Sequence, residues 1–120
     1  MFIRRLGDCE EFVAGDNTVL RELLHPDKAD LGPVRYSLAH AKLAPGLTSI
    51  LHCMKTSEVY YIIEGKGVMR IDGEEAEVTA GDAILIPPGA AQQITNTGAG
   101  DIAFLCIVDP AWRVEDEEVL

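Results

Sequence analysis

Residues 46–65 read GLTSILHCMKTSEVYYIIEG, and this stretch decides the fold of the chain. The segments on either side of Lys55–Ser57 are typical of two short strands joined by a turn. Residues two apart on a strand share a face, so His52 and Met54 point the same way. If the second strand folds back antiparallel, Glu58 joins them. The stretch therefore predicts that these three side chains converge on one point.

A second stretch, residues 81–96, reads GDAILIPPGAAQQITN and contributes a fourth side chain. Pro87 and Pro88 must end the strand before them, because neither proline can donate to a strand ladder. After that turn, Gln92 and Asn96 share a face of a later strand. We expect Gln92 to meet the first three side chains inside the mouth of a barrel. Asn96 is interpreted as a turn or structural residue.

The rest of the chain follows a strand rhythm from Val34 onward. Turn residues recur at intervals of about eight to twelve positions, which is typical of an all-β barrel or sandwich. The predicted strands are residues 35–42, 47–54, 58–64, 67–71, 74–78, 83–86, 92–96 and 102–108. Asp72-Gly73 favours a type I′ hairpin turn, which needs positive φ at both positions. Residues 1–34 are predicted to be irregular, although 18–24 could form a short strand or a helical turn.

The spacing of the glycines, His52, Glu58, the Pro87-Pro88-Gly89 element and Asn96 resembles the two signature motifs of the cupin superfamily. The resemblance implies an all-β antiparallel jelly-roll, or double-stranded β-helix, barrel around a metal held by three histidines and one glutamate. Met54 and Gln92 stand here where two of those histidines are expected. The chain is most similar to small single-domain cupins of the cupin_2 type, described as mannose-6-phosphate isomerase-like. Such proteins are typically homodimers.

The resemblance also divides the chain. Residues 34–110 are predicted to be the cupin β-barrel, and residues 1–33 an N-terminal arm with a dimer-contact strand region. Residues 111–120 contain four consecutive acidic residues, 115–118. We interpret this end as a solvated acidic C-terminal tail.

The chemistry of the four converging side chains suggests a metal site. His52 offers an imidazole nitrogen and Glu58 a carboxylate, which are both good ligands for first-row transition metals. Gln92 offers a weaker amide oxygen, and Met54 offers a soft thioether that favours copper. The predicted cofactor is a divalent transition metal: zinc, nickel, iron, manganese or copper. Alternatively, Met54 only fills the barrel and Gln92 hydrogen-bonds Glu58 or a water molecule.

Glu58 and Tyr60 are the candidate catalytic residues, because they share a face of one strand. The Tyr60 hydroxyl could lie near a substrate, or it could belong to core packing. His25 and His40 lie outside both motifs and are interpreted as surface or loop residues. Cys106 lies on the last strand, and the pattern does not decide which face it takes.

Composition limits the partners. The net charge of −10 argues against nucleic acid and against anionic membrane surfaces, which need a basic footprint. Three widely spaced cysteines without a CxxC pair suit a reducing, cytoplasmic environment. No apolar run approaches the ~20 residues that span a bilayer.

Two functions remain open at this stage. The first is a metal-dependent enzyme acting on a small polar metabolite, such as a sugar, sugar phosphate or carboxylic acid. The second is a non-catalytic binding protein for a sugar or organic acid, with a degenerate metal site in the same barrel mouth. In both, the partner is a small-molecule ligand and the chain is a homodimer.

Overall fold

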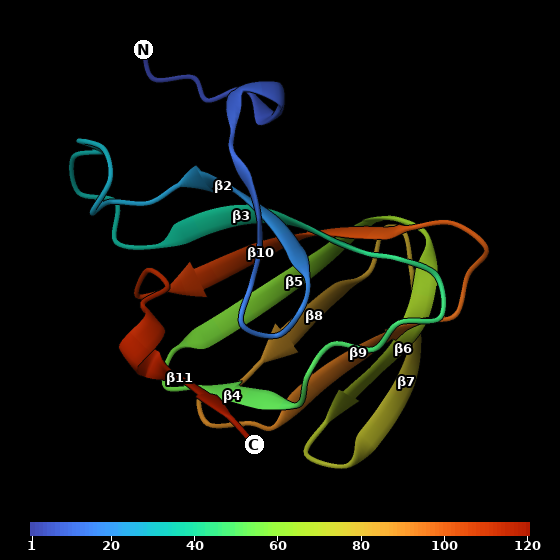
Figure 1. Ribbon diagram of the computed structural model, residues 1–120. Helices are drawn as coiled ribbons and strands as arrows, with labels where there is room; N and C mark the ends of the chain where they lie inside the picture. Colours follow the sequence, from blue (N-terminus) through green and yellow to red (C-terminus); the bar gives the residue numbers. More distant parts are fainter.

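The computed structural model describes residues 1–120 and consists of two antiparallel sheets that face each other (Figure 1). The six-stranded sheet has the order β1-β2-β3-β10-β5-β8, with β1 Glu11–Val13, β2 Val19–Leu24, β3 Ser37–Leu43, β10 Ile102–Asp109, β5 Ser57–Glu64 and β8 Ala83–Ile86. The five-stranded sheet has the order β11-β4-β9-β6-β7, with β11 Glu117–Val119, β4 His52–Met54, β9 Gln92–Asn96, β6 Lys66–Ile71 and β7 Glu74–Thr79. The predicted all-β jelly-roll fold is confirmed.

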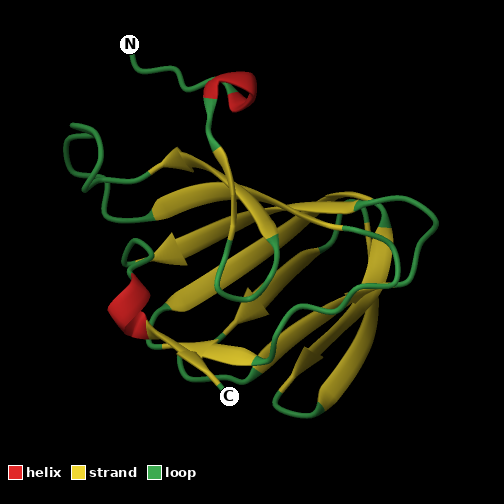
Figure 2. Cartoon of the chain, viewed as in Figure 1, coloured by secondary structure: helices red, strands yellow, loops and turns green.

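Helix is confined to two single 3₁₀ turns, Leu6–Asp8 and Val114–Asp116 (Figure 2). Neither is long and apolar enough to cross a membrane. The open choice for residues 18–24 is resolved as a strand, because β2 pairs with β3 and with the short β1. Asp72 and Gly73 have φ values of 49° and 83°, so the predicted type I′ hairpin between β6 and β7 is confirmed.

The strand predicted over residues 47–54 is wrong in its first half. Only His52–Met54 forms a strand, preceded by an isolated bridge at Thr48. The Ser49 side chain turns inward, and its hydroxyl accepts a hydrogen bond from the Ile94 amide. The next amide, that of Ile50, donates to the Asp16 carbonyl instead of to the sheet. The hydrogen bond to Asp16, in the N-terminal region, therefore interrupts the strand and the alternation of its side chains between the two faces.

The core lies between the two sheets and is built from inward-facing side chains of strands in both. Its buried members are Ala41, Leu43, Tyr60, Ile62, Met69, Val78, Ile86, Ala90, Ile94, Ile102, Phe104 and Cys106. Asn96, the last residue of β9, is buried and donates hydrogen bonds to the Leu43 and Gly100 carbonyls. Its predicted structural role is confirmed.

Both chain ends are more ordered than predicted, and both reach the barrel mouth. The expectation of a solvated tail is wrong for Glu117–Val119, which pairs antiparallel with β4. The backbone bonds from Lys55 to Asp116 and from Leu120 to Leu51 extend this pairing on both sides. At the other end of the chain, the turn between β1 and β2 bonds to Ile50. These two segments from opposite ends of the sequence close the mouth around β4.

Candidate functional site

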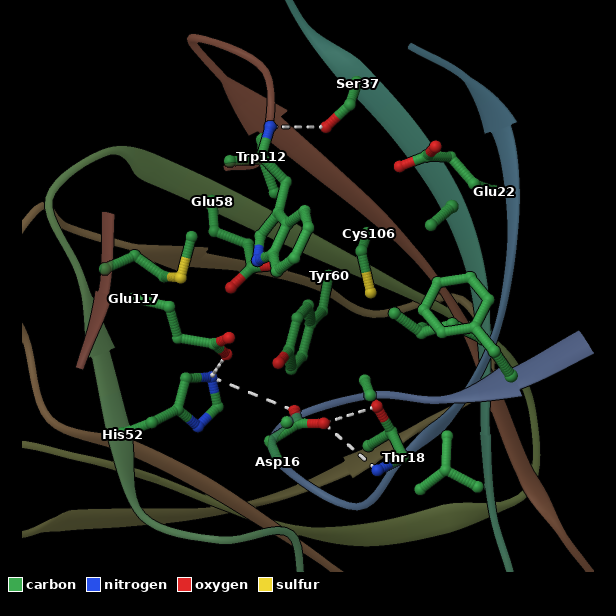
Figure 3. A pocket seen from close by; sticks show the side chains of 18 residues that line it. Asp16, Thr18, Glu22, Ser37, His52, Glu58, Tyr60, Cys106, Trp112 and Glu117 are labelled. Carbon is green, nitrogen blue, oxygen red and sulfur yellow. Dashed lines mark hydrogen bonds and ion pairs between the residues drawn. The ribbon is translucent and has the colours of Figure 1, made fainter. Parts of the chain in front are cut away.

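A cavity of about 190 Å³ opens where the chain ends meet the barrel mouth (Figure 3). Polar side chains gather on one part of its wall, and apolar side chains form most of the remainder. The lining residues are Phe12, Val13, Ala14, Gly15, Asp16, Thr18, Leu20, Glu22, Ser37, Ala39, His52, Met54, Glu58, Tyr60, Cys106, Val108, Trp112 and Glu117. Such a partly enclosed, largely apolar cavity with a few polar groups is typical of a small-molecule site.

His52 holds the centre of the polar wall. Strand β4 orients it inward, and only 3% of the residue is exposed. Its Nδ1 lies 2.8 Å from the Ile50 carbonyl oxygen, which can only accept, so Nδ1 carries a proton. The other ring nitrogen, Nε2, faces the cavity. Nε2 itself makes no hydrogen bond within the chain.

Two carboxylates face this nitrogen, one from each end of the chain. The distances from His52 Nε2 to Asp16 Oδ2 and to Glu117 Oε1 are both 3.8 Å (Figure 3). Asp16 is fixed by its own turn, because its Oδ1 accepts hydrogen bonds from the amide and hydroxyl of Thr18. Glu117 is placed by the pairing of β11 with β4. Burial is the largest cause that raises the pKa of Glu117, and the nearby Asp16 raises it further.

Three buried side chains, linked by hydrogen bonds, support the part of the wall that Glu58 and Tyr60 form. The Tyr60 hydroxyl donates to Gln92 Oε1 at 3.0 Å, and Gln92 Nε2 donates to Glu58 Oε1 at 3.0 Å. All three residues are buried, and Gln92 is completely inaccessible. The amide of Gln92 is thus satisfied at both ends, and it fixes the orientation of the Glu58 carboxyl. The second oxygen of Glu58 has no partner in this network.

Burial changes the protonation of Glu58. It raises the pKa of this carboxyl from 4.5 to about 8, against the opposing effect of the hydrogen bond from Gln92. The negative charges of Asp16 and Glu117 raise it further. Near neutral pH, Glu58 is therefore a neutral acid that faces the cavity. A carboxyl in this state can donate a proton.

The four predicted metal ligands do not form one donor set. His52, Met54 and Glu58 line the cavity, whereas Gln92 lies behind it with its oxygen bonded to Tyr60. The three that remain supply one imidazole, one carboxyl and one thioether, in place of the three imidazoles and one carboxylate that the motif leads one to expect. No group of three or more histidine, cysteine, aspartate or glutamate side chains is arranged to hold a metal ion. The residues therefore do not fit the predicted metal, and the alternative, in which Gln92 hydrogen-bonds Glu58, matches the structure.

The structure also places the other residues that the sequence left open. Tyr60 lines the cavity, but its phenol proton is engaged by Gln92, and burial raises its pKa well above 10.0. Cys106 faces inward, and burial raises the pKa of its thiol well above 9.0. His25 lies in a loop as expected, yet it is buried and hydrogen-bonded to the Trp112 carbonyl. His40 lies on β3, partly exposed.

Sequence reasoning missed Asp16, Glu117 and Trp112. Asp16 belongs to a Gly-Asp-Asn-Thr run that reads only as a turn, although an aspartate two residues before a threonine favours the Asx turn that fixes it here. Glu117 is one of four consecutive acidic residues, and nothing local distinguishes it from its neighbours. Asp16 and Glu117 reach the site through contacts between segments far apart in sequence, and no short sequence motif predicts such contacts.

Fold and site together define a small jelly-roll barrel with a small-molecule cavity at its mouth. The family model described as the cupin domain matches residues 39–108, and the chain belongs to this family. The family was therefore identified correctly from the two motifs. The narrower likeness to mannose-6-phosphate isomerase-like cupins remains a prediction.

Three similar proteins illustrate the range of the family. A protein of Methanocaldococcus jannaschii, described as uncharacterized, is 41% identical over 110 residues, covering 91% of this chain and 86% of its own. An oxalate-binding protein of Thermotoga maritima is 37% identical over 71 residues, covering 58% of this chain and 59% of its own. The crystal structure of a predicted oxalate decarboxylase from Thermotoga maritima has a TM-score of 0.77 at 25% identity, covering 89% of this chain and 97% of that one.

The buried Glu58 makes a prediction about stability and pH. Its folded-state pKa of about 8 lies above the unfolded value of 4.5, so its stabilising effect is full below about pH 4.5 and is lost as the pH rises through about 8. This shift corresponds to roughly 5 kcal/mol. Glu58→Gln keeps an oxygen acceptor for Gln92 but cannot ionise. We expect the free energy of unfolding of the wild type, relative to this variant, to fall by several kcal/mol between about pH 5 and about pH 9.

Urea denaturation at several pH values measures this difference. Glu64→Gln is the matched control, because Glu64 lies on the same strand but is exposed. A stability difference between the wild type and Glu58→Gln that does not change with pH would contradict the assigned protonation.

Proposed function

We propose that the barrel mouth binds a small polar metabolite and catalyses a proton transfer on it, with Glu58 as the acid and His52 as the base. The observation that carries the proposal is that both residues face one cavity with a free polar atom. His52 Nε2 has no hydrogen bond, and one oxygen of Glu58 has no partner. Groups held rigidly at a cavity wall and still free to bond are suited to substrate recognition and proton transfer.

The supporting residues have positioning roles in this proposal. Tyr60 fixes Gln92, and Gln92 fixes the Glu58 carboxyl. The Glu58 pKa of about 8 lies close to neutral pH, and a general acid is most effective when its pKa is near the working pH. The predicted catalytic role of Tyr60 becomes one of orientation, because its proton is already donated. The proposal assigns the proton transfer to these side chains and routes no step through a metal.

The second candidate is binding without catalysis. The same free groups could serve only to orient a ligand by hydrogen bonds, and the largely apolar wall supports simple binding as well. The oxalate-binding relative gives this alternative a concrete probe. The three cysteines form no disulfide, which agrees with the proposed cytoplasmic location.

We also propose that the chain is a homodimer through the outer face of the six-stranded sheet. Large apolar side chains are exposed there on three adjacent strands: Tyr61 and Ile63 on β5, Leu85 on β8 and Ile107 on β10. The register joins them, because Val59 lies opposite both Leu85 and Ile107. A contiguous apolar face of this kind is typical of an interface.

Ligand binding is tested with oxalate, D-mannose 6-phosphate and D-glucose, followed by the fluorescence of Trp112, the single tryptophan, which lines the cavity. Ala39→Leu fills the cavity and should abolish the response, because Ala39 also lines it. Ala83→Leu, on the exposed edge strand β8, should leave it unchanged. Equal binding by the Ala39→Leu variant would contradict the cavity as the site.

Catalysis is tested on D-mannose 6-phosphate or D-glucose, by following exchange of the C–H protons of the sugar in D₂O by NMR, whereas oxalate, which has no C–H proton, serves only as a binding probe. Glu58→Gln and His52→Ala should each slow the exchange by about 10²-fold or more, since general acid–base groups contribute at least that much. Binding without exchange in the wild type would establish the non-catalytic alternative instead.

Light scattering tests the dimer. Leu85→Glu should convert a species of two chains to one, because it puts a charge on the proposed interface. Val114→Glu is the control, since Val114 is equally apolar and exposed but lies outside that face. A dimeric Leu85→Glu variant would contradict this surface.

A further inference from the structure

We infer that the polar end of the cavity recognises a protonated primary amine, with its ammonium group held among Asp16, His52 and Glu117. This inference rests on the proposed function of the cavity as a small-molecule site, and it names the chemical class of the ligand. A cationic amine differs from the sugar, sugar phosphate or carboxylic acid that the sequence led us to expect as the ligand.

The charges of the wall favour a cation. Four carboxyl groups line the cavity, on Asp16, Glu22, Glu58 and Glu117, and no lysine or arginine does. Glu22 is paired with Lys28, and Glu58 accepts a hydrogen bond from Gln92. Asp16 and Glu117 lie 3.8 Å from His52 and have no lysine or arginine partner. A carboxylate or phosphate ligand would add negative charge beside them, which is unfavourable in a partly desolvated site.

The acceptors at this end match the donors of an ammonium group. Asp16 Oδ2 and Glu117 Oε1 each lie 3.8 Å from His52 Nε2, which is too far for a hydrogen bond to that nitrogen. An –NH₃⁺ group has three N–H donors and no acceptor, which suits two carboxylate oxygens and the Nε2 of a neutral His52. His52 is more than nine-tenths buried, and its Nε2 faces the cavity without a hydrogen bond to the chain.

The remainder of the wall suits an aliphatic body. Val13, Leu20 and Val108 line the cavity, and the Trp112 ring lies beside the polar end (Figure 3). Trp112 is held in place through its backbone, because its amide donates to the Ser37 hydroxyl and its carbonyl accepts from His25. Indole is the best aromatic partner for a cation. Carboxylates, an aromatic ring and an apolar cavity together favour an alkylammonium ion over a hydrated inorganic ion.

The test uses ¹⁵N-labelled protein freed of metal by a chelator and titrated with n-butylammonium chloride, sodium butanoate or n-butanol. The indole N–H of Trp112 gives a single indole signal, because the chain has one tryptophan. We expect n-butylammonium to shift this signal saturably, with a Kd at least about tenfold below that of n-butanol. Asp16→Asn and Glu117→Gln should each remove most of this preference.

The variants are chosen so that the fold is kept. The amide oxygen of an asparagine can still accept from Thr18, so Asp16→Asn retains the turn. Glu118→Gln is the matched control, because Glu118 lies beside Glu117 on β11 but is exposed and does not line the cavity, and it should leave the preference unchanged.

Each alternative result has its own meaning. Butanoate or butanol binding as tightly as n-butylammonium would overturn the amine assignment while the cavity site stands. A chelator-reversible shift with zinc or manganese chloride, without a shift by n-butylammonium, would overturn it in favour of a metal ion. No shift with any compound would count against both the amine and the proposed function.

Discussion

The contact between the Gln92 amide and the buried Glu58 carboxyl is the interaction on which the barrel mouth depends. Gln92 occupies the position where the motif leads one to expect a histidine, and it uses its two polar atoms on Tyr60 and Glu58. An imidazole there would direct a lone pair at a metal. An amide instead ties a carboxyl to the core, in a place where burial keeps it neutral. A glutamine at this position therefore gives the site a different donor set, whereas burial is what raises the pKa of Glu58.

The barrel and the chain ends contribute different parts of the site. Strands of the barrel supply His52 and Glu58, positioned by sheet pairing, whereas the apolar wall includes Val13, Leu20 and Trp112 from the two ends of the chain. The ends supply Asp16 and Glu117, which carry the negative charge. Because these ends fold over β4 from two directions, the charge of the cavity can differ between relatives that share the same barrel. A family assignment alone would not reveal this charge.

The sequence predicted the parts of the structure that depend on local rules. Alternation and turn chemistry located most of the barrel strands, and the type I′ turn at Asp72 followed from the φ preference of two residues. His52, Met54 and Glu58 were correctly expected to converge. Prediction failed where a distant partner competes with local pattern. Ser49 turns inward because its hydroxyl accepts from the Ile94 amide, and Glu117 becomes a strand residue because it pairs with β4.

The same contrast between local pattern and distant partners applies to Gln92, which was predicted as a metal ligand but hydrogen-bonds Tyr60 and Glu58. Its face on β9 was predicted correctly enough to bring it to Glu58, but its amide could serve either a metal or a neighbour. Only the position of the Tyr60 hydroxyl resolves that choice, and it depends on packing between sheets. The local sequence pattern thus identified which residues come together, whereas their hydrogen-bond partners depended on how the two sheets pack.

The most direct test of this account is the pKa of Glu58 itself. Carbon-detected NMR of the side-chain carboxyls, with Glu58 assigned by its absence in Glu58→Gln, follows its titration without a substrate. The account predicts a midpoint of about 8, with the carboxyl neutral through most of the range below it. A midpoint near the ordinary value of 4.5 would contradict it, because the cavity would then hold an ionised Glu58 and lack its proton donor.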